Sequence, residues 1–168
     1  MLSQKLLDEL NLQIKYELES AHYYVAMQAY FDGIDLPGFA HFFKMQAAEE
    51  RFHADKFYEY VFEADGKVEL TSLDLPGKDF DSPLDVFEKA LAHEQFVTKR
   101  IYHLMDIARE EKNYATQSML NWFVDEQLEE ENSMRENIAI LERVKDNPNG
   151  LYMLDRQLAA RTFTPEAE

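Results

Sequence analysis

Cysteine is absent from the 168 residues of this sequence. Its absence excludes disulfides, zinc fingers, cysteine-ligated iron–sulfur clusters and cysteine nucleophiles. Any metal ion that the chain binds must therefore be held by carboxylate, imidazole or phenolate groups.

Basic residues and long apolar runs are also scarce. The chain has 17 Lys and Arg against 33 Asp and Glu, which gives a formal net charge of −16. Nucleic acids and anionic membrane surfaces bind clusters of Lys and Arg, so we expect neither as a partner. A negative surface instead favours solubility and attracts cations. No apolar run is long enough to span a membrane, and the first twenty residues are too charged for a signal peptide, so we expect a cytoplasmic location.

Glycine and proline number only five each, and nearly all of them lie between long segments with a helical period. Apolar residues spaced three or four apart predict helices over about 3–32, 37–65, 83–112 and 114–145, and a short one over about 151–160. Gly33 and Gly66 are expected to end the first two helices, and Ser82 is expected to cap the third. The length suits one domain over 1–168.

The lengths of the connections predict the topology. Short links make the first two helices one antiparallel hairpin and the next two another. The 17 residues 66–82 have no helical period, and fully extended they reach roughly 55 Å. A helix of about 28 residues is only roughly 42 Å long, so this segment can run the length of the bundle. We therefore predict an all-α, ferritin-like four-helix bundle with one long crossover between helices two and three, plus a short fifth C-terminal helix.

The two predicted hairpins repeat a set of polar residues at a constant offset. Positions 77 apart carry matching donors, and the pairs are Glu17 with Glu94, Glu49 with Glu126, Glu50 with Gln127, and His53 with Glu130. Each first helix thus supplies a Glu, and each second helix supplies a pair three residues apart on one face. Any one of these acids taken alone is an ordinary surface charge; the shared offset marks them as a constellation.

Carboxylates that converge inside a bundle repel one another unless cations neutralise them. A carboxylate-rich set with a single imidazole suits iron or manganese better than a closed zinc site. Glu50 is the natural bridge between two metals, and the replacement of a second Glu-x-x-His by Gln127 to Glu130 predicts weaker binding of the second one. Tyr24, seven residues after Glu17, faces the same way and is placed to hydrogen-bond a ligand. Glu131 and most other acids are expected to be solvated.

Four stretches resemble the prokaryotic non-haem ferritins, and the likeness extends over essentially the whole chain. They are Glu17–Tyr24, Ala48–His53, His93–Gln95 and Trp122–Glu131. The resemblance implies a ferroxidase centre with a first iron on Glu17, Glu50 and His53. It implies a second iron on Glu50, Glu94 and Glu130, with Tyr24 and Gln127 beside it. It also implies a third iron site, with the ligands Glu49, Glu126, Glu129 and Glu130.

Related families differ at identifiable residues. Bacterioferritins have a haem-ligating Met where this chain has Arg51, so we expect no haem. Rubrerythrins need cysteine for their additional iron, and mini-ferritins lack the fifth helix that residues 151–160 resemble. That helix lines the four-fold axes of 24-subunit ferritins, so the resemblance implies a homo-oligomeric 24-mer cage.

The resemblance implies an iron store with ferroxidase activity. Fe(II) would be oxidised by O2 or H2O2 at the paired sites, and ferric oxo-hydroxide mineral would be deposited in the cavity. Two alternatives remain open. One is a di-metal oxidase or oxygenase of the same fold, which needs an apolar substrate pocket at the metals; the other is a non-catalytic acidic scaffold or cation buffer.

Overall fold

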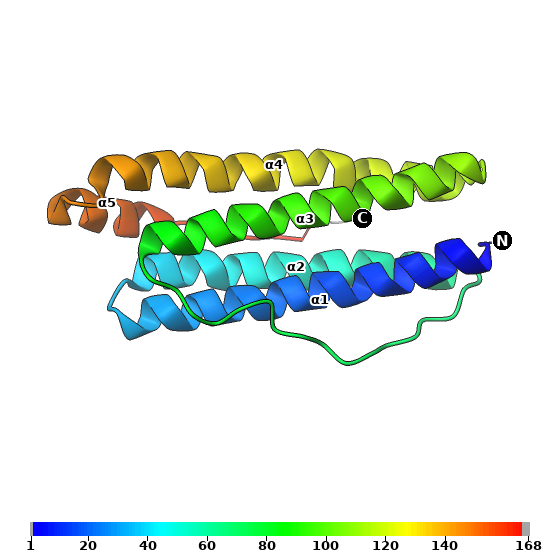
Figure 1. The fold of residues 1–168 in the computed structure, drawn as a ribbon, viewed down its shortest axis with the longest axis horizontal. Helices are drawn as coiled ribbons and strands as arrows, with labels where there is room; N and C mark the ends of the chain where they lie inside the picture. The colour runs from blue at the N-terminus through cyan, green and yellow to red at the C-terminus, as the bar shows by residue number, and fades with distance from the viewer. Residues whose placement is uncertain (1, 166–168) are drawn as a thin grey trace.

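The computed structural model describes residues 2–165, and this part of the chain contains helices and no strands. The helices are α1 (Gln4–Gly33), α2 (Pro37–Glu63), α3 (Pro83–Glu110), α4 (Tyr114–Val144) and α5 (Pro148–Leu158). None of them is long and apolar enough to cross a membrane. In Figure 1, α1 pairs with α2 and α3 with α4, and α5 lies at the end of the bundle where α4 finishes. The predicted all-α bundle is confirmed.

The crossover between α2 and α3 runs along the outside of the α1–α2 pair from one end of the bundle to the other (Figure 1). It begins where α2 ends and delivers the chain to the opposite end, where α3 begins. Because of this, α2 and α3 run parallel to each other, as the length of the segment predicted. The middle of α2 and the middle of α3 therefore lie at the same level along the axis of the bundle (Figure 1).

Polar side chains cap four of the helices. Ser3, Ser82, Asn113 and Asn147 each accept hydrogen bonds from backbone N–H groups in the first turn of the helix that follows. The cap at Asn147 makes α5 begin at Pro148, three residues before the expected start at 151. A proline interrupts a helix interior but fits its first turn, so the residues expected to be only a break are also the start of α5.

The turns between helices use acidic and basic residues in the left-handed region instead of glycine. Asp35, Asp65 and Lys112 have φ angles of 58°, 55° and 54°. Gly33 is the last residue of α1, as expected, and the chain reverses two residues later at Asp35, because aspartate tolerates the left-handed conformation. Gly66 is required for a different reason: a Cβ there would lie 2.9 Å from a backbone oxygen of α2.

Two apolar clusters fill the bundle, one toward each end. The first is rich in aromatic rings, with Phe31 stacked between Phe39 and Phe43 at centroid distances of 4.9 and 5.6 Å. The second is mainly aliphatic and includes Leu10 and Ile101. Between the two clusters, each of α1 to α4 contributes buried polar residues. This polar layer contains Glu17, Glu50, His53, Glu94, Gln127 and Glu130.

Helix α5 is attached to the start of α2 by one buried carboxylate. Asp155 Oδ1 accepts hydrogen bonds from the backbone N–H groups of Gly38 and Phe39, at 2.8 and 3.1 Å. The residue before α2, Leu36, has no side chain that can cap it, so Asp155 serves as the cap from a distant segment. The contact is so close that a Cβ on Gly38 would lie 1.7 Å from the Asp155 carbonyl oxygen.

Candidate metal centre

The inner cluster consists of Glu17, Glu50 and His53, all of which are at most 1% exposed. One potential ligand atom from each lies within 4.8 Å of the others. Glu50 and His53 are three residues apart on α2, so both point from one face toward Glu17 on α1. His53 Nδ1 is 3.5 Å from Glu50 Oε2. The structure thus brings together the three residues that the resemblance assigned to the first iron.

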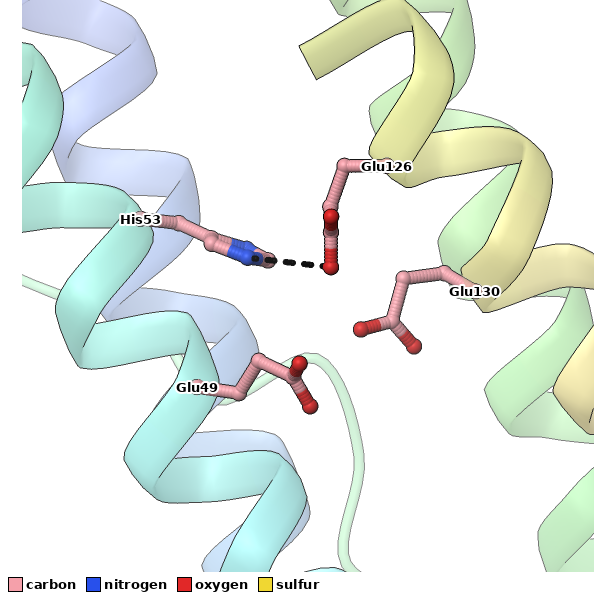
Figure 2. A group of neighbouring side chains, drawn as sticks. All are labelled: Glu49, His53, Glu126 and Glu130. Atoms are coloured by element: carbon pink, nitrogen blue, oxygen red, sulfur yellow. Dashed lines mark ion pairs between the residues drawn. The ribbon is translucent and has the colours of Figure 1, made fainter. Parts of the chain in front are cut away.

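The outer cluster consists of Glu49, His53, Glu126 and Glu130, whose potential ligand atoms also lie within 4.8 Å of one another. Figure 2 shows that α2 supplies Glu49 and His53 and that α4 supplies Glu126 and Glu130, with all four side chains pointing into one space. His53 Nε2 is 3.9 Å from Glu126 Oε1. A single imidazole therefore lies between the inner and outer clusters, with one ring nitrogen toward each.

The outer cluster opens into a cavity of about 270 Å³. Its wall includes Trp122 and the exposed Glu129, which is one of the predicted third-site ligands. The structure thus gathers Glu49, Glu126 and Glu130 with His53, while Glu129 lies at the cavity beside them.

Glu94, on α3, completes the buried carboxylates of the layer. It accepts hydrogen bonds from the Tyr24 hydroxyl and from Gln127 Nε2, the latter at 3.0 Å. Gln127 Nε2 also lies 3.2 Å from the Glu94 backbone oxygen, so one side chain holds both ends of this residue. Tyr24 and Gln127 therefore orient Glu94 toward the middle of the layer.

Two glutamines that the sequence analysis did not single out support the ligands. Gln13 Nε2 donates to Glu17 Oε1 and Gln46 Nε2 donates to Glu130 Oε2, each at 2.8 Å. Both glutamines are fully buried. Each lies four residues, or about one helical turn, before a cluster carboxylate in its own helix, and that spacing was the available signal.

The expectation that Glu131 is solvated is wrong. Its carboxylate accepts a hydrogen bond from Thr98 Oγ1 at 2.7 Å and pairs with Arg135, and its side chain is only 14% exposed. Thr98 lies between Glu131 and the buried layer, because its hydroxyl is also 3.4 Å from Gln127 Nε2. Glu131 is therefore connected to the residues that orient Glu94.

Burial controls the charge of the layer. It raises the pKa of Glu17 to about 7 and that of Glu94 to about 6, and it raises the pKa values of Glu50 and Glu130 well above their ordinary range. Negative neighbours add to the effect: the charge of Glu94 raises the pKa of Glu17, Glu50 and Glu130 further. Burial lowers the pKa of His53 to about 3, so its imidazole is neutral and has a free lone pair.

Several buried atoms of the clusters have no hydrogen-bond partner among the described residues. They include Glu17 Oε2, Glu50 Oε2 and His53 Nε2. A buried polar atom without a partner is costly, and a carboxylate without a counter-charge is more so. A cation coordinated by these atoms removes both costs. Four carboxylates with one imidazole form an oxygen-rich donor set, which suits iron.

Comparison with known proteins identifies the family. Residues 7–144 match the family model of the ferritin-like domain. The chain belongs to the ferritin family. A bacterial non-heme ferritin of Staphylococcus aureus (strain USA300) is 47% identical over 166 residues, which cover 99% of this chain and all of that relative. The one from Staphylococcus haemolyticus (strain JCSC1435) is 46% identical over the same lengths, so the predicted membership of the bacterial-type non-haem ferritins is confirmed.

Solved structures agree with this ferritin over nearly its full length. A ferritin of Archaeoglobus fulgidus, engineered into a closed form, is 40% identical and superimposes with a TM-score of 0.96 over 98% of this chain and 100% of its own. An open-pore ferritin from the same archaeon is also 40% identical, with a TM-score of 0.95 over 96% of this chain and 100% of its own. The ferritin-like fold, with its crossover and fifth helix, is therefore shared with proteins of known structure.

Proposed function

We propose that this ferritin stores iron and oxidises it on entry, as a ferroxidase. Fe²⁺ is the substrate, O2 or H2O2 is the oxidant, and ferric oxo-hydroxide is the stored product. Family membership supports iron storage. The site supports the oxidation, and the single observation that carries it is the convergence of unpartnered carboxylate and imidazole atoms in a buried layer.

Each residue of the inner cluster and each of its neighbours has its own role in this proposal. Glu17, Glu50 and His53 hold one ferrous ion; Glu50, Glu94 and Glu130 hold the second, so that Glu50 bridges the pair. Tyr24 and Gln127 keep Glu94 oriented through the hydrogen bonds described above.

The electron balance needs both ions. Each ferrous ion gives up one electron, and two of them with two protons reduce O2 to H2O2 or reduce H2O2 to two waters. Holding two ions at bridging distance supplies both electrons in one place.

A third iron, leaving the oxidation site, is proposed to bind Glu49, Glu126, Glu129 and Glu130 on its way to the mineral. The cavity beside the outer cluster supports this route, because Glu129 and Glu126 line it. We further propose that the chain assembles into a 24-subunit cage in the cytoplasm, without haem and without nucleic acid or membrane partners. The match to ferritins over 96–100% of both chains supports the cage.

The two alternative functions fit the site less well. An oxidase acting on an organic substrate needs an apolar pocket. The cavity beside the outer cluster has aromatic residues in its wall, but it also presents three carboxylates, those of Glu49, Glu126 and Glu129. A passive acidic scaffold has no need for carboxylates in its interior, where each ionised carboxylate raises the free energy of the folded state unless a cation or a proton neutralises it.

Anaerobic titration with Fe²⁺ followed by a pulse of oxygen tests the proposal. We expect two to three ferrous ions to bind per chain and oxygen to be consumed rapidly. The triple variant Glu17→Ala/Glu50→Ala/His53→Ala is expected to lose the inner sites and the rapid phase. A matched control removes three exposed carboxylates instead, Glu59→Ala/Glu88→Ala/Glu136→Ala, and is expected to behave like the wild type.

Size-exclusion chromatography tests the cage independently. Twenty-four copies of a 19.8-kDa chain amount to about 475 kDa, which is easily separated from a monomer or dimer. Rapid oxidation that persists in the triple variant would overturn the assigned centre. A small particle with normal oxidation would overturn the cage and favour the oxidase alternative.

A further inference from the structure

The segment that follows α5 covers the outer cluster. After α5 the chain turns back toward the middle of the bundle (Figure 1). Thr162, Phe163 and Thr164 then form part of the wall of the 270 Å³ cavity, together with Glu126 and His53. A piece of the chain about a hundred residues beyond the end of α2 thus closes the space into which the outer ligands point.

Three contacts fix this segment to α2. His41 Nε2 donates to the Arg161 backbone oxygen at 2.7 Å. The guanidinium of Arg161 lies over the ring of Phe42, 4.6 Å from its centroid. The ring of Phe163 packs against that of Phe52, with a centroid distance of 5.9 Å. The segment is therefore held at Arg161 itself and at Phe163, two residues further on.

The fixed position brings a permanent positive charge to the outer cluster. Arg161 Nη2 donates to Glu49 Oε2, and both side chains are largely buried, at 21% and 14% exposed. A guanidinium does not lose its proton, so this charge is constant with pH. Its field also reaches Glu130, whose pKa it lowers against the effect of burial. Two of the four outer ligands therefore have a counter-charge from the protein itself.

We propose that Arg161 is a built-in counterion of the outer cluster, which competes with a metal ion for Glu49 and shortens the time the ion stays there. The inference rests on the proposed metal-binding function of the cluster. When an ion binds Glu49, the guanidinium must give up its hydrogen bond, and when it re-forms that bond, it displaces the ion toward the cavity. Arg161 is a positioning residue in this scheme, because it touches a ligand and not the iron.

Trp122 provides a direct measurement. It is the single tryptophan of the chain, it lines the cavity, and its ring centroid is 5.5 Å from that of His53. Anaerobic titration of the assembled protein with Co²⁺, whose open d shell quenches nearby indole fluorescence, reports binding at both clusters. Mixing the loaded protein with a chelator reports the rate of release. Glu49→Gln, which removes a ligand of the outer cluster alone, identifies the phase that belongs to that cluster.

Arg161→Gln is expected to bind the outer Co²⁺ about tenfold more tightly and to release it more slowly, with the inner phase unchanged. Arg156→Gln is the matched control, because it removes an exposed arginine in α5 and changes the net charge equally. In the Glu49→Gln background, Arg161→Gln should have a much smaller effect on the outer phase, because only its field at Glu130 is left to lose. Size-exclusion chromatography verifies that each variant assembles.

Three results would overturn the inference. Equal binding and release in Arg161→Gln and Arg156→Gln would remove the competition, while the proposed metal site would stand. Weaker outer binding in Arg161→Gln would mean that the arginine only supports Glu49. No saturable Co²⁺ quenching in the wild type would overturn the proposed metal function together with this inference.

Discussion

His53 is the residue on which both clusters depend. Its ring lies between Glu50 and Glu126, with Nδ1 toward the first and Nε2 toward the second. Burial keeps the ring neutral by lowering its pKa to about 3, so it carries no positive charge that would repel a metal ion. A neutral imidazole has one free lone pair, so it can serve only one of the two clusters fully at any moment.

The raised pKa values of the buried acids predict an unusual pH dependence of stability. An acid whose pKa is higher in the folded state binds its proton more tightly there, so it stabilises the fold below its unfolded pKa of 4.5 and loses that contribution as the pH rises through the folded value. For Glu17 that value is about 7 and for Glu94 about 6. Protein stripped of metal should therefore be more stable, and melt at a higher temperature, at pH 5 than at pH 8, with Glu17 contributing on the order of 3 kcal/mol to the difference in the free energy of unfolding.

Thermal unfolding at fixed protein concentration between pH 5 and 8 measures this effect. Glu17→Gln should reduce the slope, because an amide does not titrate, while Glu88→Gln at an exposed position should leave it unchanged. A slope of the opposite sign, or one that Glu17→Gln does not alter, would contradict the assigned pKa shifts.

Gln46 predicts a second effect at the residue scale. Its amide donates to Glu130, which belongs to the outer cluster and to the proposed second iron site. Gln46→Leu removes the donor and is expected to weaken metal binding about 10- to 100-fold, the usual cost of losing a group that orients a ligand. Isothermal titration with Zn²⁺ measures it. Gln95→Leu, at an exposed position beside Glu94, is the control and should retain the affinity of the wild type.

The sequence predicted the charged members of the layer but not their supports. The carboxylates and His53 share the 77-residue offset, so they stand out together from the many surface acids. Gln13 and Gln46 do not share it: the positions 77 residues later hold Ala90 and Phe123. Supporting groups are set by local packing in each half of the bundle, so a repeat of ligands does not reveal them. Glu131 was misjudged for the same reason, since only its contact with Thr98 distinguishes it from a solvated acid.

At the scale of elements, the attachment of α5 depends on one glycine. Gly38 lets the carbonyl of Asp155 approach α2, and any Cβ there would collide with it. Gly38→Ala is therefore expected to displace α5 and expose its amides to hydrogen exchange. Gly33→Ala is the matched control: no atom lies within 4 Å of its Cβ, and a helical Gly-to-Ala change is expected to stabilise α1 by about 0.5–1 kcal/mol.

Hydrogen exchange followed by mass spectrometry measures both variants. Protection of residues 148–158 should fall in Gly38→Ala and be retained in Gly33→Ala. Retained protection in Gly38→Ala would mean that α5 can shift without leaving its place.

Helix identities were easier to predict than helix ends. Long apolar periodicity predicts an element reliably, and the 17-residue crossover left one topology for the four long helices. The ends depended on details without a clear sequence signal, such as the left-handed Asp35 and the cap that α2 receives from Asp155. A cap from a residue more than a hundred positions away cannot be read from the local sequence.

At the scale of the whole molecule, metal ions are expected to stabilise the folded chain. Ligands that bind only the folded state raise its stability with concentration, by about 2.7 kcal/mol at a free concentration one hundred times the Kd. Zn²⁺ should therefore raise the melting temperature at pH 7, and a chelator should reverse the change. The triple variant Glu17→Ala/Glu50→Ala/His53→Ala should show little response, and an equal response in that variant would mean that the stabilising sites lie elsewhere.

The layered interior has a consequence for movement through the bundle. An aromatic cluster closes the polar layer on one side and an aliphatic cluster closes it on the other, and the buried members of both include no carboxylate and no imidazole that could carry an ion along the helix axes. The two ends of the bundle are thus apolar barriers to an ion that moves parallel to the helices. An ion can reach the polar layer more easily from the side of the bundle, between helices. The cavity next to Glu126 is one opening on that side. Iron that enters or leaves the proposed sites is therefore expected to cross the bundle between helices and not along them.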